Sequence, residues 1–283
     1  MISIKKHVNN IQKNGYTIIR NGIDHELANH VIAEFDEWSS NPENQFVPFQ
    51  QERVTNFHMH SKNTLDLVTN TYVNKIVSSL LNKEQSVYCS LFFREGTSGG
   101  YQRDTPHFYT NPIDQYYGVL YALEDIDVNS GPLKYYIGSH KLDNVDGHEI
   151  YNSIYSDNDT LDLNTDFRCF IKYNEQIEKK CKELKLTEVN IKNNKKIEKG
   201  DIFIWHPRLL HGGSKIIDNT LTQYSMVTYN IPMNTAVFCS THFFSKSPTD
   251  EYVKNECVFD YIEHNDVNIV DHNTGPQVQK TFA

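Results

Sequence analysis

The sequence predicts a mainly β fold, and three observations lead to this prediction. Short runs rich in β-branched and aromatic residues, bounded by turn residues, are typical of strands. They lie at 87–93, 116–123, 133–137, 201–205 and 223–231. The chain also has 17 Tyr and 15 Phe, residue types that favour strands. Its 283 residues are a common length for one β-sandwich or barrel domain, so we expect a single domain over residues 1–283.

Helices are predicted mainly before the first long strand. Apolar residues recur at helical spacing in three segments, and a short strand at 16–19 follows the first of them. The helices are expected at 3–13, 24–38 and 64–81. Beyond Asp260 the pattern of apolar residues trails off.

Residues 143–195 form a polar insertion, rich in Asn, Asp and Lys. A helical patch is expected within it at about 174–184. Insertions of this length are often functional, so the segment either covers a site or decorates a loop.

Composition excludes several classes of function. The net charge is −9 and the Lys and Arg residues are dispersed, which argues against a nucleic-acid surface. No run approaches the roughly 20 apolar residues of a membrane span. The N-terminus lacks an apolar signal core, and the five Cys have no paired spacing. We therefore expect a cytoplasmic protein that binds neither nucleic acid nor a membrane, and its oligomeric state stays open.

The stretch 200–214 is the most informative segment. A short apolar run at 202–205 follows a Gly-Asp turn and predicts a buried strand. His211 comes soon after, followed by Gly212 and Gly213, which let another backbone approach closely. His211 is therefore a candidate metal ligand. The alternative is a hydrogen-bonded core histidine.

Three further motifs accompany this stretch in a fixed order. They are Gln102-Arg103-Asp104-Thr105-Pro106-His107, Tyr121-Ala122-Leu123-Glu124-Asp125 and Gly131-Pro132-Leu133 through Gly138-Ser139-His140. Together with the Gly-Asp…His-Gly-Gly stretch, this order resembles the phytanoyl-CoA dioxygenase family over roughly residues 8–235. The resemblance implies a double-stranded β-helix (jelly roll) with the N-terminal helices packed outside it. It also implies an iron(II)- and 2-oxoglutarate-dependent dioxygenase, an oxidoreductase that hydroxylates a small or carbohydrate-like molecule.

The resemblance assigns the metal ligands residue by residue. Asp104 matches the carboxylate and His211 the second histidine, while Gln102 stands where the family has the first histidine. The neutral amide of a Gln is a weaker iron(II) ligand than imidazole, so the metal site is altered. We assign His107 and Arg103 as candidate catalytic residues.

Two alternatives to this assignment stay open. Asp104 in Asp-Thr-Pro is also a common turn residue, whose carboxylate caps the local backbone. A different register takes His107 and Tyr109 as the first ligand pair.

The co-substrate position departs from the family as well. Gln223 stands where the family has the Arg that holds the distal carboxylate of 2-oxoglutarate. Gln223 and Ser225 are the candidate cofactor-binding residues, but Gln lacks the bidentate charged fork of Arg. Lys215 and Arg208 are the cations nearby in sequence that would compensate. Otherwise they are solvated surface charges.

Two hypotheses follow from these departures. The first is an oxygenase of this family with an altered iron and 2-oxoglutarate site. The second is a descendant of the fold without redox chemistry, either a metal-independent enzyme or a small-molecule binding module. Positions 102 and 223 distinguish them.

Overall fold

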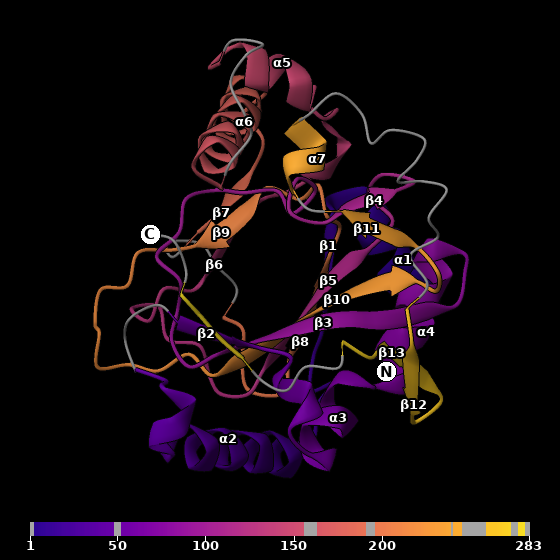
Figure 1. Cartoon of the computed structure of the whole chain (residues 1–283), viewed down its shortest axis with the longest axis vertical. Helices are drawn as coiled ribbons and strands as arrows, with labels where there is room; N and C mark the ends of the chain where they lie inside the picture. Colours follow the sequence, from indigo (N-terminus) through magenta and orange to yellow (C-terminus); the bar gives the residue numbers. More distant parts are fainter. Residues whose placement is uncertain are drawn as a thin grey trace.

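The structure is a computed structural model that describes residues 3–47, 52–155, 163–190, 196–238, 240–244, 259–272 and 277–280. Its strands are mostly antiparallel and form a double-stranded β-helix with helices at both ends (Figure 1). The mainly β prediction is therefore confirmed. All five predicted strands are present, and they are β3 (Gln85–Phe93), β5 (Tyr117–Ala122), β6 (Leu133–Tyr136), β8 (Ile202–Trp205) and β10 (Ser225–Pro232).

The large sheet has nine strands. Its central path runs β1-β8-β5-β10-β3-β13-β12, and β2 pairs with β3 and β14. The strands not yet named are β1 (Tyr16–Ile19), β2 (Glu52–Thr55), β12 (Tyr261–His264), β13 (Val267–Val270) and β14 (Gln277–Lys280). All described pairings in this sheet are antiparallel except that of β13 with β3.

Two small sheets complete the strand layers. One has the order β7-β6-β9 and the other pairs β11 with β4. Their remaining strands are β4 (Tyr109–Asn111), β7 (Glu188–Val189), β9 (His211–Gly213) and β11 (Ala236–Phe238). Strand β9 begins at His211, so this residue belongs to the small sheet β7-β6-β9.

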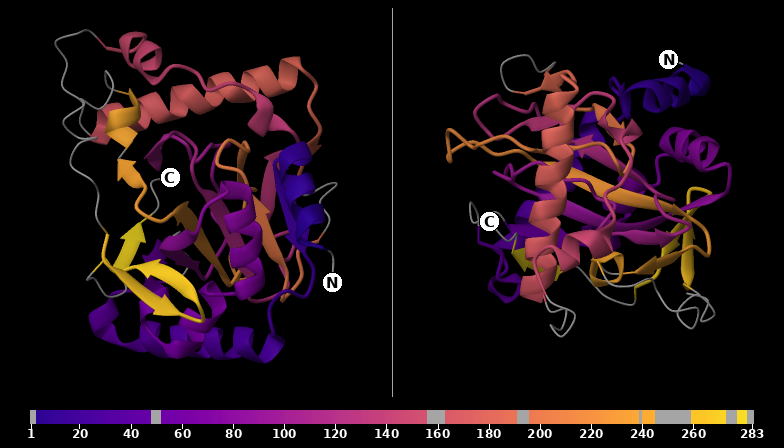
Figure 2. Two further views of the ribbon diagram at one scale, coloured as in Figure 1. Left: turned by 90° about the vertical axis from the view of Figure 1, so that its right-hand side faces the viewer. Right: turned by 90° about the horizontal axis from the view of Figure 1, so that it is seen from above.

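The helices pack in two groups, one against the outer face of the large sheet and the other across one end of the strands (Figure 2). The N-terminal group is α1 (Ile4–Asn14), α2 (His25–Ser40), α3 (Lys62–Val68) and α4 (Thr71–Leu81), and the other group is α5 (Gly147–Asn152), α6 (Leu163–Glu183) and α7 (Ser240–Phe244). Alternate residues of the large sheet, such as Val54, Phe92 and Met226, share an apolar core with the N-terminal group. The residues between them face the other way, toward the small sheets. The N-terminal helices therefore lie outside the β-helix, as predicted.

The single helix predicted over 64–81 is wrong. The structure has two helices, and Asn70 lies between them. The Asn70 side chain accepts hydrogen bonds from the N–H groups of Tyr72 and Val73, both at 3.1 Å. An Asn that caps a new helix ends the continuity that apolar spacing alone suggested.

The insertion holds a helix longer than the predicted patch. Helix α6 has 21 residues and begins at Leu163. Its buried side, including Tyr173 and Ile177, packs with residues of α5 and α7. The long helix thereby lies across one end of the strand layers (Figure 2).

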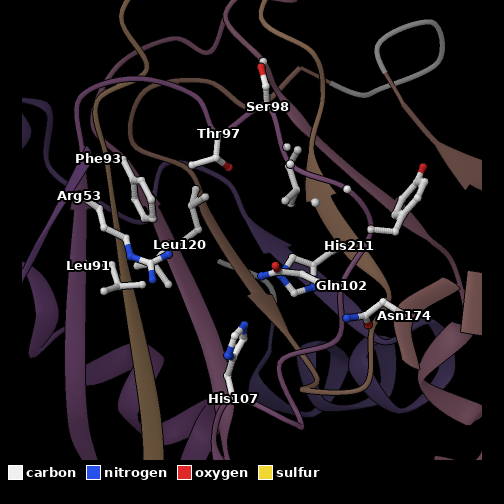
Figure 3. A pocket seen from close by; sticks show the side chains of 18 of the residues that line it. Arg53, Leu91, Phe93, Thr97, Ser98, Gln102, His107, Leu120, Asn174 and His211 are labelled. Atoms are coloured by element: carbon white, nitrogen blue, oxygen red, sulfur yellow. The ribbon is translucent and has the colours of Figure 1, made fainter. Parts of the chain in front are cut away.

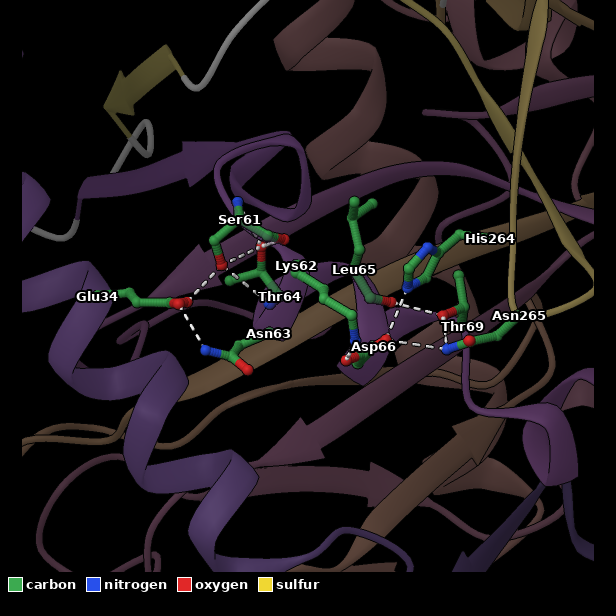
Figure 4. A network of polar contacts seen from close by, with 10 residues as sticks. All are labelled: Glu34, Ser61, Lys62, Asn63, Thr64, Leu65, Asp66, Thr69, His264 and Asn265. Carbon is green, nitrogen blue, oxygen red and sulfur yellow. Dashed lines mark hydrogen bonds and ion pairs between the residues drawn. The ribbon is translucent and has the colours of Figure 1, made fainter.

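The C-terminal segment contains strands that the sequence did not predict. The turn between β12 and β13 is tied to α3, because Asp66 accepts hydrogen bonds from His264 (2.6 Å) and Asn265 (3.0 Å) (Figure 4). Burial acts to raise the pKa of Asp66, but hydrogen bonds from Lys62, His264 and Asn265 outweigh it and lower the pKa to about 2. Asp66 is therefore ionised at neutral pH and anchors the hairpin.

Candidate active site

His211 presents one ring nitrogen to a buried carboxylate. Its Nδ1 lies 2.9 Å from the carbonyl oxygen of Leu209. A carbonyl only accepts, so Nδ1 carries the proton and Nε2 keeps its lone pair. Nε2 lies 3.6 Å from Oδ1 of Asp104. This pair offers two of the donor types that iron(II) prefers.

Asp104 is held rigidly from behind. Trp205 Nε1 donates to its Oδ2 at 2.7 Å, and the Tyr229 hydroxyl lies 3.5 Å from its Oδ1. Burial raises the pKa of Asp104, against the lowering effects of the neighbouring His211 and of these hydrogen bonds. The carboxylate is fully buried and does not line the cavity, although His211, Trp205 and Tyr229 do. The backbone carbonyl of Asp104 closes the Asp-Thr-Pro turn, because it accepts a hydrogen bond from the N–H of His107 at 2.8 Å.

Gln102 lies directly opposite His211. The two residues exchange both backbone hydrogen bonds, at 2.7 and 2.9 Å, as an isolated antiparallel bridge. Paired residues direct their side chains to the same face, and both side chains line the cavity (Figure 3). The amide of Gln102 thus lies beside the His211 imidazole. In the described part of the chain, no three His, Cys, Asp or Glu residues form a group that could hold a metal ion.

His107 lines a different part of the same cavity (Figure 3). Its ring packs on Phe170 with 4.1 Å between centroids. The side chain is exposed to the cavity, but the surrounding protein reduces its solvation. This desolvation, together with the Arg53 charge, lowers the pKa of His107 to about 4. His107 is therefore neutral at pH 7. Tyr109, its partner in the alternative register, packs instead on Phe243.

Ser225 begins β10 and Gln223 lies two residues before it, and both line the cavity. The Gln223 amide lies 3.1 Å from the Ser130 hydroxyl, and with its nitrogen turned inward it also donates to the carbonyls of Ser130 (3.2 Å) and Gly131 (3.3 Å). Its polar atoms therefore hold the 130–131 turn. Ser225 lies on the same side of the strand, opposite Phe93.

Arg103 points away from the cavity. It is fully buried, and its guanidinium donates to the carbonyls of Ser139 (2.7 Å) and Leu142 (2.9 Å) and to Asn144 (3.0 Å). Its backbone N–H donates to Asn174 of α6 at 2.8 Å. Arg103, predicted as catalytic, is not among the cavity-lining residues. Its hydrogen bonds instead connect the 139–144 segment with α6. An arginine between two candidate ligands carries no sequence signal that its side chain turns the other way.

The two glycines after His211 admit a crossing loop, as expected. A Cβ on Gly213 would lie 1.6 Å from the Thr97 carbonyl oxygen, and one on Gly212 would lie 2.3 Å from that of Gly100. Residues 97–100 therefore run directly over β9 and form part of the cavity wall.

The cavity itself has a volume of about 630 Å³ and lies between the large sheet and the small sheet β7-β6-β9. Pockets of roughly 300–1,000 Å³ are typical of small-molecule sites. One face of α6 closes it, through side chains at helical spacing: Phe167, Phe170, Ile171, Asn174, Glu175 and Glu178. The insertion therefore covers the site. The predicted patch began too late, at 174, to include its apolar half.

Sequence reasoning also missed Arg53. This residue of β2 lines the cavity and is the one Lys or Arg among the described lining residues. Neither of the compensating cations considered from the sequence does so. Arg208 pairs with Asp114 at 3.4 Å, and Lys215 is exposed. A lone Arg in a four-residue strand gives no local signal, because its position depends on pairing with β3.

A jelly roll with a cavity between its two layers, and with His211 on the cavity wall, defines a fold class that the cupin-like oxygenases share. The family model described as "Phytanoyl-CoA dioxygenase (PhyH)" matches residues 11–217, most of the chain. The chain belongs to the phytanoyl-CoA dioxygenase family. No curated protein sequence matches it.

Solved structures share this fold at low sequence identity. The α-ketoglutarate-dependent epimerase SnoN from nogalamycin biosynthesis aligns with a TM-score of 0.64 and 13% identity, over 94% of this chain and 97% of its own. The carbocyclase SnoK from the same biosynthesis gives 0.62 and 15%, over 93% and 95%. EctD from S. alaskensis with bound Fe gives 0.62 and 13%, over 88% and 85%. Within the described residues, no helix is long and apolar enough to cross a membrane.

Proposed function

We propose that this chain is an iron(II)/2-oxoglutarate-type oxygenase for a small organic molecule, with an altered metal site. The observation that carries the proposal is the Asp104–His211 pair, with Oδ1 and Nε2 3.6 Å apart beside a cavity of about 630 Å³. In this assignment Asp104 and His211 are the strong metal ligands and Gln102 takes the third position. These three residues would hold iron(II), which would supply the dioxygen chemistry for oxidation of the substrate.

The donor set fits iron(II) weakly. The tautomer of His211 is correct for a ligand, because Nδ1 is engaged with Leu209 and Nε2 keeps its lone pair. Trp205 fixes the carboxylate from behind, so neither donor has to be reoriented. Gln102 contributes only a neutral amide oxygen, which is a poorer ligand than imidazole. Moderate to weak affinity is the expected result.

Metal binding is measurable through Trp205, whose ring centroid lies 5.3 Å from that of His211. The chain has two Trp, so Trp38→Phe leaves Trp205 as the sole indole reporter. Anaerobic titration with iron(II) should quench this emission weakly. Gln102→His, which restores an imidazole, should tighten binding at least about tenfold, or about 1.4 kcal/mol.

Two variants make this test specific. His211→Ala should abolish the quenching, whereas His30→Ala, an exposed histidine on α2, should not change it. If Gln102→His leaves the affinity unchanged, position 102 is not part of the metal site.

The co-substrate clamp gives a second prediction. Gln102→His completes the metal site, and Gln223→Arg supplies the charge that the family uses for the carboxylate of 2-oxoglutarate. Because both groups would contact one ligand, the double variant should gain more iron-dependent 2-oxoglutarate affinity than the two single gains added together. Calorimetry of the four proteins measures this coupling. Simple additivity would contradict a shared ligand.

A second candidate function is a metal-independent binding protein. The Gln223 amide favours it, since the 130–131 turn already engages this side chain. Under this candidate, ligand affinity is the same with iron(II) and with a chelator, even in the Gln102→His variant. The oxygenase proposal expects iron(II) to increase 2-oxoglutarate affinity in that variant.

A further inference from the structure

Arg53 reaches the cavity through the register of the large sheet. It pairs with Phe93 of β3, which in turn pairs with Ser225 of β10. Directly paired residues direct their side chains to the same face. Arg53 therefore lies two strands across from Ser225 on the cavity wall, while its neighbour Val54 is fully buried against the N-terminal helices.

The surroundings of Arg53 strengthen the electrostatic interaction that its charge can make with a bound anion. Figure 3 shows its side chain beside Leu91, Phe93 and Leu120, on the opposite side of the cavity from Asn174. Apolar neighbours lower the local dielectric, so a charge there interacts more strongly with a bound counter-ion than it would in water. The Arg53 charge already acts across the cavity, because it contributes to lowering the pKa of His107.

The acidic residues of the cavity lie on other elements. Glu175 and Glu178 belong to α6, and Glu178 pairs with Lys182 at 2.6 Å. Glu95 follows the end of β3, two residues beyond the Phe93 that pairs with Arg53. The two carboxylates on α6 therefore favour an anionic group on the side of the cavity away from α6.

We propose that Arg53 anchors a carboxylate of the cavity's ligand. The guanidinium supplies a planar, bidentate donor pair that matches a carboxylate. The ligand is thus an organic acid whose body extends from Arg53 toward Gln102 and His211. This inference rests on the proposed function for the location of the ligand, but not on metal binding.

The carboxylate has two possible sources, the co-substrate or the substrate itself. Metal-free protein in a chelator is titrated with 2-oxoglutarate in one arm and with hexanoate in the other, by ligand-observed NMR. Hexanamide, which has the same carbon chain without the charge, is the neutral control. We expect at least one carboxylate to bind at millimolar concentration or better, and the arm that binds identifies the source.

Substitutions then assign the binding to Arg53. Arg53→Gln should weaken carboxylate binding at least about tenfold, the typical effect of losing a charged bidentate partner. Arg53→Lys keeps the charge but not the fork, so it should give an intermediate loss. Neither change should alter the behaviour of hexanamide. Lys215→Gln, which removes an exposed cation close in sequence to β9, is the matched control and should bind like the wild type.

Three results would overturn the proposal. They are the absence of carboxylate binding to the wild type in both arms, unchanged affinity in the Arg53 variants, and an equal loss for hexanamide. Thermal melting checks that each variant is folded, and Arg53→Lys decides the question if Arg53→Gln is unstable. Because every titration is metal-free, failure of the iron experiment leaves this test intact.

Discussion

Gly118 shapes the surroundings of the Asp104–His211 pair through its contact with Trp205. It pairs with Trp205 between β5 and β8, and a Cβ at this position would lie 2.2 Å from two carbons of the indole ring. The ring can therefore lie flat on the strand only because residue 118 has no side chain. Through this contact, Gly118 sets the position of the N–H that holds Asp104.

Gly118→Ala should displace Trp205 and destabilise the fold. Overpacking of this kind costs about 1–3 kcal/mol. In the Trp38→Phe background, the emission of Trp205 should also shift, since its hydrogen bond to Asp104 is strained or broken. Chemical denaturation followed by fluorescence measures both effects.

The control is Gly100→Ala, where an added Cβ has nothing within 4 Å. It should leave both the stability and the emission close to those of the wild type. Equal behaviour of the two variants would mean that the strand at Gly118 moves to accommodate a side chain.

At the scale of elements, α6 has two faces with different tasks. Ile177 is fully buried in the cluster shared with α5 and α7. Ile171 is 42% exposed and lines the cavity, as does Phe167 at 40%. One face therefore fixes the helix to the protein, and the other presents apolar surface to a ligand.

A matched pair of variants separates these tasks. Ile177→Ala should reduce the free energy of unfolding by about 2–5 kcal/mol, because it leaves a cavity in a packed cluster. Ile171→Ala should cost less than about 1 kcal/mol, since half-exposed side chains lose little on truncation. It should instead weaken ligands with apolar bodies, such as hexanoate.

Thermal or urea denaturation and the NMR titration together give both readings. A large loss of stability in Ile171→Ala, with ligand binding unaffected, would show that this face packs on the protein rather than on a ligand.

For the whole molecule, buried histidines make stability depend on pH. Burial, with the nearby His272 charge, lowers the pKa of His58 to about 3. Burial and the charges of His140, Arg208 and Arg103 lower the pKa of His206 to about 3. In the unfolded chain both groups have the ordinary value of about 6.5.

The direction of the effect follows from proton binding. Between pH 6.5 and 3 the unfolded chain binds protons that the folded protein excludes, so stability falls as the pH is lowered through this range and is constant above it. From pH 7 to pH 5 each histidine should cost about 2 kcal/mol. Urea denaturation at a series of pH values measures the slope.

His58→Gln tests the assignment to a particular residue. His58 has Nε2 buried without a hydrogen-bond partner in the described structure, and its Nδ1 lies 2.6 Å from the Ser90 hydroxyl. Removing it should lessen the loss between pH 7 and 5 by about 2 kcal/mol, whatever its effect at pH 7. The exposed His30→Gln is the control. An unchanged slope in His58→Gln would assign the acid sensitivity to other groups.

The sequence by itself determined the strand set and the motif positions. Short apolar runs such as 202–205 are strands because a fully buried strand requires apolar residues on both faces. The resemblance of the Gln102–Asp104 motif to the family predicted that both residues lie next to His211, and the structure places them there. Local turn residues and side-chain types are sufficient for such features.

Only the tertiary structure decided what lies across the cavity. Arg53 enters the site because β2 pairs with β3. In this pairing Arg53 lies opposite Phe93, which is 40 residues later in the chain. Arg103 leaves the site because loop carbonyls near Ser139 and Leu142 take up its guanidinium. Strand pairing and buried hydrogen bonds join residues that are distant in sequence. No local sequence pattern therefore predicts which side chains line the cavity.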